Sequence, residues 1–119
     1  MKKFIRRAVL ATALFAATAG VAMADNNNRE VTIVNATGVT MNNFYSSNSA
    51  TTNWGPDQLG ANETLAAGSS KAWNFDDGSG ACLFDFKAVF IDSAGHQHNA
   101  VRNRINVCQV STFTFSSID

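Results

Sequence analysis

The chain has 119 residues, 45% of them hydrophobic, and its nine Lys and Arg residues balance nine Asp and Glu residues. A chain of this length forms one domain, and it lacks the basic excess that nucleic-acid binding requires. After position 24 it contains 13 Asn, 10 Ser and 8 Thr residues but one Pro. Because Asn and Ser favour turns over helix interiors, we expect helix to be a minor component.

The first 24 residues have the pattern of a bacterial secretory signal peptide. Cations at positions 2, 3, 6 and 7 precede an apolar run over residues 8–19, and Ala22-Met23-Ala24 supplies a cleavage site of small residues. The run is shorter than the roughly 20 residues of a spanning helix, so we expect export without a membrane span. Residues 25–119 then form a single β domain, periplasmic or secreted. Its five cations and nine anions give a net charge of −4.

The first part of this domain has two strand patterns and a long polar segment. Residues 29–35 alternate apolar and polar side chains, and an Asn-Ala-Thr-Gly turn leads into residues 39–45. These two runs predict a hairpin. Residues 46–60 are rich in Ser, Asn and Thr, with Trp54 and Leu59 as their only large apolar side chains. A segment of this length without regular structure is often functional.

The second part contains the clearest strand. The sequence predicts a short strand over residues 71–75 and, after an Asp-Asp-Gly-Ser-Gly turn, a longer strand over residues 82–91. Residues 96–107 and 110–115 complete the series. Six or seven short strands with frequent turns predict a small β-sandwich, Ig-like or similar, and a small β-barrel is the alternative. The two-residue period places one face of the long strand in the core: Cys82, Phe84, Phe86, Ala88 and Phe90.

The opposite face of that strand is polar in the middle and apolar at its ends, as expected of a sheet face that is half covered. Asp85 and Lys87 lie on this face and can pair across it. An exposed pair of this kind contributes little to stability.

Two cysteines, Cys82 and Cys108, remain after cleavage. An even number of cysteines without C-x-x-C spacing in an exported protein predicts a structural disulfide. Two buried free thiols are the alternative.

Several segments resemble a family of small exported bacterial β proteins. They are VTIVNATG from Val31, NWGPDQLG from Asn53, LAAGSS from Leu65, the stretch from Asn74 to Gly95, and the second Cys. The resemblance covers nearly all of residues 25–119 and implies an exported β domain, without implying a reaction. Members often carry an automated argininosuccinate lyase label, which does not fit this chain because that enzyme is a large helical tetramer. The usual Asp-Gly after the long strand is replaced here by Asp-Ser-Ala-Gly.

His96 and His98 are candidate metal ligands. Two positions apart on a strand, both imidazoles point to one side and can share a copper or zinc ion. An exposed pair beside a turn gives the same sequence pattern.

Asp76 and Asp77, with Asp57, are candidate oxygen ligands for calcium. Their spacing lacks the alternating acidic ladder of a calcium loop, and Asp-Asp-Gly is also an ordinary turn.

Trp54, with Pro56 and Leu59, is a candidate binding residue. Large apolar side chains in a polar loop either fold back as a lid on the core or form an exposed contact surface. We expect the lid.

No catalytic motif is present: the sequence lacks G-x-S-x-G, H-E-x-x-H and a glycine-rich phosphate loop. We therefore expect a noncatalytic binding or envelope-associated structural module without a cofactor, with a protein or envelope partner. A periplasmic protein that binds calcium, copper or zinc is the alternative.

Overall fold

The computed structural model describes residues 28–119, so the predicted signal peptide lies outside the described residues. Between residues 28 and 119 the secondary structure is entirely β, and no helix there has the length and apolar character to cross a membrane. The six strands are β1 (Glu30–Asn35), β2 (Met41–Asn48), β3 (Ser70–Asn74), β4 (Leu83–Ile91), β5 (Gln97–Asn106) and β6 (Thr112–Phe115).

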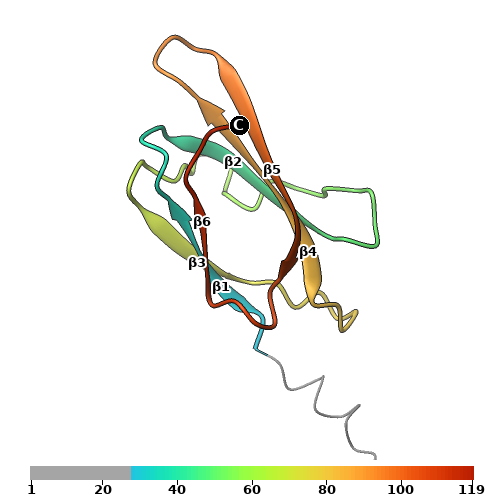
Figure 1. Ribbon diagram of the computed structural model, residues 1–119. Coiled ribbons are helices and arrows are strands. Elements are labelled where there is room, and N and C mark those ends of the chain that lie inside the picture. The colour runs from blue at the N-terminus through green and yellow to red at the C-terminus, as the bar shows by residue number, and fades with distance from the viewer. Residues whose placement is uncertain (1–27) are drawn as a thin grey trace, which may run out of the picture.

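The strands form two three-stranded sheets, in the orders β3-β1-β6 and β2-β4-β5 (Figure 1). β1 is antiparallel to β3 and parallel to β6, whereas β4 is antiparallel to both of its neighbours. The sheets pack face to face, because the ring of Phe44 in β2 stacks 4.8 Å from that of Trp73 in β3. The predicted β-sandwich is confirmed, and the sheets do not join into the alternative barrel.

The predicted hairpin at the start of the domain is wrong, because β1 and β2 belong to different sheets. The buried side chain of Asn35 forms the corner between them. Its Nδ2 donates to the carbonyls of Val39 at 2.8 Å and Leu65 at 2.9 Å, and its Oδ1 accepts from the Thr37 hydroxyl at 2.7 Å. With the strands on opposite sheets, the apolar faces of both point into one core.

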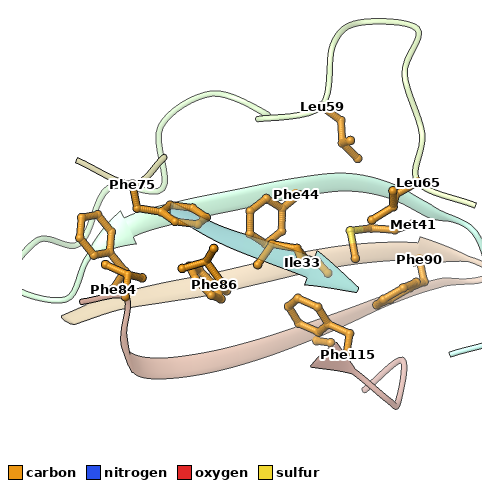
Figure 2. Packing of buried hydrophobic residues seen from close by; sticks show 14 residues of the cluster. Ile33, Met41, Phe44, Leu59, Leu65, Phe75, Phe84, Phe86, Phe90 and Phe115 are labelled. Carbon is orange, nitrogen blue, oxygen red and sulfur yellow. The ribbon is translucent and has the colours of Figure 1, made fainter. Parts of the chain in front are cut away.

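Six of the 14 residues in the core cluster are Phe (Figure 2). Phe44 and Phe86 are fully buried, with ring centroids 5.4 Å apart. Removing a Phe side chain of this kind from water is worth about 1.5–3 kcal/mol. The predicted inward face of β4 is confirmed, because all four of its residues within the strand are buried: Phe84, Phe86, Ala88 and Phe90.

A disulfide joins Cys82 and Cys108, as predicted, and ties the start of β4 to the segment after β5. This bond fits an oxidising compartment. Arg29, which is buried and directly precedes β1, stabilises the same end of the sandwich. Its guanidinium donates to the carbonyls of Ala81 at 2.9 Å and Gly80 at 3.0 Å.

Candidate functional site

The long polar segment begins as strand and then folds back onto the sandwich. β2 continues to Asn48, so the first three residues of the predicted loop are strand. The Asp57 carboxylate accepts from the backbone N–H of Phe44 at 2.9 Å and from Asn43 Nδ2 at 2.8 Å. Leu59 follows at 1% exposure and packs into the core, where Figure 2 shows it reaching inward from the loop. Asp57 and Leu59 therefore anchor the returning end of this loop.

In the sequence, Trp54 lies between the end of β2 and the anchors Asp57 and Leu59. Its side chain does not join the core. It is partly exposed and packs on the outer face of the β2-β4-β5 sheet. The Lys87 ammonium lies 5.4 Å from the centre of the Trp54 ring and 4.9 Å from the centre of the Tyr45 ring. Both distances fit cation–π contacts. Leu59 thus covers the core as a lid would, whereas Trp54 is carried onto the outside of the sheet.

The strand register explains why Tyr45 and Lys87 meet. They are directly opposed in the β2–β4 ladder, and Val101 of β5 is opposed to Lys87 on its other side. Val89, next on the same face of β4, is buried at 6% exposure, whereas Val101 is 42% exposed. We call the accessible part of this surface the Trp54 face and define it by four residues: Tyr45, Trp54, Lys87 and Val101.

The charge at the centre of the Trp54 face is not neutralised within the described part of the chain. Asp85, which shares this strand face with Lys87, accepts from the Ser49 hydroxyl at 2.7 Å and from the backbone N–H of Arg104 at 2.9 Å. Across residues 28–119, no carboxylate lies within ion-pair distance of the Lys87 ammonium. The face therefore combines two aromatic rings, one positive charge and exposed aliphatic surface.

Asp76 and Asp77 lie in the turn that precedes β4, and each has one carboxylate oxygen bonded within that turn. Asp76 Oδ1 accepts from the N–H of Gly78 at 3.0 Å, and Asp77 Oδ1 accepts from the hydroxyl of Ser79 at 2.5 Å. The hydroxyl bond, followed by the backbone bond to Ser79, lowers the pKa of Asp77. Both aspartates line a cleft of about 250 Å³, together with Ser46, Ser47, Asn48, Gln58, Asn74, Phe75 and Phe84.

The two histidines converge on one carboxylate. His98 Nε2 lies 2.9 Å from Asp92 Oδ2, and its Nδ1 lies 3.3 Å from Asp119 Oδ1. His96 is more exposed, with Nδ1 3.8 Å from the same Asp92 oxygen. The bond to Asp92, and then that to Asp119, raises the pKa of His98, while the His98 bond lowers the pKa of Asp92. Within the described residues, no three His, Cys, Asp or Glu side chains are arranged to hold a metal ion.

Sequence reasoning selected Trp54 but missed its neighbours. The sequence allows Tyr45 and Lys87 each to be placed on the outward face of its strand, because they alternate with the core residues Phe44 and Phe86. Their meeting with Trp54 depends on where the loop returns, and no periodic pattern encodes that. In comparisons with protein-family models, curated proteins and solved structures, none matches this chain.

Proposed function

We propose that this chain is an exported, noncatalytic binding module of the bacterial cell envelope, and that it docks a protein partner through the Trp54 face. One observation carries the proposal: the Lys87 ammonium lies within cation–π distance of both the Tyr45 and the Trp54 ring, on a sheet face that the core does not use. Trp and Tyr are enriched among the residues that dominate protein–protein binding energy. An aromatic centre with a polar surround is also the usual anatomy of an interface.

Export is supported by three features of the chain. Residues 1–24 have the signal-peptide pattern, and the disulfide between Cys82 and Cys108 suits the periplasm or the exterior. The resemblance to small exported bacterial β proteins agrees with both. A noncatalytic role is supported by the absence of a catalytic motif from the sequence and by the pairing of both cysteines, which leaves no thiolate nucleophile.

The chemistry of the Trp54 face indicates what the partner presents. Lys87 is the only charged residue among the four that define this face, and it lacks an acidic neighbour within ion-pair distance in residues 28–119. Val101 adds exposed aliphatic surface beside it. A protein segment with a carboxylate next to an apolar side chain complements both features. A partner that excludes water from the ammonium beside these rings strengthens the attraction between the ammonium and such a carboxylate.

Site-specific photocrosslinking in the exporting cell tests this proposal. A photoreactive phenylalanine analogue at Val101 reports on the Trp54 face, and the same analogue at Ala72 is the matched control. Ala72 is an exposed residue in the middle of β3, on the other sheet. We expect discrete crosslinked species from position 101 alone. Equal patterns from both positions, or none from position 101, would contradict the proposal.

Metal binding is the second candidate function, and the cleft with Asp76 and Asp77 is the observation that favours it. Carboxylate, amide and hydroxyl oxygens surround this cleft, and calcium prefers six to eight oxygen ligands. One oxygen of each aspartate is bonded within its own turn, so a metal would use the other. For His98, binding a metal requires breaking the contacts with Asp92 or Asp119.

A further inference from the structure

A second cavity, of about 320 Å³, opens beside the disulfide where β4 begins. Ala50, Ala81 and Leu83 give it apolar walls, Asn48 and Ser49 add polar groups, and Arg104 is the one charged residue in its lining. Its volume lies at the lower end of the range of about 300–1,000 Å³ found for small-molecule sites. The sequence offered no sign of this cavity, because its walls come from three separate segments of the chain.

The backbone at Arg104 is strained. Phe84 pairs with Ile105 but Phe86 pairs with Arg102, so two residues of β5 oppose Asp85 alone and form a bulge. Arg104 has a φ of 58°, and it is the only residue other than glycine with positive φ between residues 28 and 119. A side chain makes this left-handed conformation costly, whereas glycine adopts it freely. Strained residues of this kind cluster at ligand sites.

Asp85 holds the bulge in place. Its Oδ1 accepts from the backbone N–H of Arg104 at 2.9 Å and from the Ser49 hydroxyl at 2.7 Å. The Asp85 carboxylate thus binds the Arg104 backbone, and Asp85 is not part of the cavity lining. The result is a fixed backbone position from which the Arg104 side chain contributes to the cavity.

The Arg104 guanidinium has no partner among the described residues, where only the backbone N–H of Arg104 is engaged. Arg29 and Arg102 differ, because the guanidinium of each donates to backbone carbonyls. A guanidinium presents a planar pair of N–H donors that matches a carboxylate. An unpaired guanidinium at an apolar cavity is therefore suited to an anion that carries an apolar body.

We propose that this cavity binds a small aliphatic carboxylate. The carboxylate pairs with the guanidinium of Arg104, and the aliphatic chain lies against Ala50, Ala81 and Leu83. An amine of the same length is repelled by the charge, and an alcohol of the same length lacks the charged end that the guanidinium recognises. This site is separate from protein docking at the Trp54 face.

Amide NMR titrations of the oxidised protein with hexanoate, acetate and hexanol test the site. Hexanoate is expected to shift the amides of Ala50, Leu83 and Arg104 saturably. Acetate lacks the aliphatic chain and hexanol lacks the carboxylate, so each is expected to bind at least about tenfold more weakly than hexanoate. Equal affinity for all three compounds, or no saturable shift with hexanoate, would overturn the proposal.

Arg104→Gly is the decisive variant, because glycine keeps the backbone N–H and relieves the left-handed strain. We expect it to fold at least as stably as the parent and to lose hexanoate binding. Saturable binding that survives in Arg104→Gly would overturn the proposal. Trp54→Ala should leave hexanoate binding unchanged, and Arg104→Gly should leave crosslinking at Val101 unchanged, so the two proposals fail separately.

Discussion

Phe86 is the side chain whose truncation best tests how the two sheets pack. It is fully buried, and its ring centroid lies 5.0 Å from that of Phe75, 5.4 Å from Phe44 and 5.4 Å from Phe113. Phe86→Ala removes contacts with both sheets and leaves a cavity, at a cost of about 3–5 kcal/mol. Domains are stable by only about 5–15 kcal/mol. At about 4–8 °C per kcal/mol for a domain of this size, the melting temperature falls by about 12 °C or more.

Calorimetry and urea unfolding of the oxidised protein measure this loss. Ile91→Ala is the matched control, because Ile91 ends the same strand at 41% exposure. Its free energy of unfolding should change by only about 0.5–1 kcal/mol. If Phe86→Ala unfolds at the same urea concentration as Ile91→Ala, then Phe86 does not hold the sheets together and the described packing is wrong.

Three further predictions concern the disulfide, His98 and the aspartate cleft. Replacing both Cys82 and Cys108 with Ser opens a loop with a sequence separation of 26 and should cost about 3.5 kcal/mol in urea unfolding; unchanged stability would contradict a structural role. The raised pKa of His98 means that its contribution to stability is complete below its ordinary pKa and is lost as pH rises through the raised value. The melting temperature should therefore fall between about pH 6 and pH 8, where Asp92 stays charged, and His98→Gln should remove this part of the pH dependence; an equal fall in the variant would exclude His98 as its source. If the cleft binds calcium, calcium should raise the melting temperature of the parent and not of Asp76→Asn/Asp77→Asn, whereas no rise in the parent would exclude this second candidate function.

Strands β1, β4 and β6 can be predicted from the sequence because each has an apolar face whose residues recur at every second position. Phe84, Phe86 and Phe90 identify β4 and its inward face from the sequence alone, and the disulfide follows from an even cysteine count. Which strands pair with one another was harder to predict from the sequence. The Asn-Ala-Thr-Gly turn suits a hairpin, but the buried Asn35 side chain bonds with Val39 and Leu65 to form a corner between sheets.

The candidate site could be predicted from the sequence only in part, because it also depends on contacts between distant segments. Trp54 is conspicuous in a polar segment, but its contact with Lys87 depends on the anchoring of the loop by Asp57 and Leu59. The bulge at Arg104 is a property of the β4–β5 register. Nothing in the local sequence around Arg104 marks a left-handed residue, because Arg has no preference for that conformation. Contacts between distant segments depend on how the strands and loops are arranged in space, which a local sequence pattern does not specify.

The most direct test of the proposed docking function is the crosslinking yield at Val101 when Trp54 is changed to Ala. Trp54 is outside the core cluster, so this variant should melt close to the parent temperature. Loss of a central aromatic residue from an interface commonly costs about 2 kcal/mol or more, which corresponds to at least a tenfold loss of affinity. We expect the crosslinked species to fall accordingly, while position 72 is unaffected. An unchanged yield in a folded Trp54→Ala variant would contradict docking through the Trp54 face.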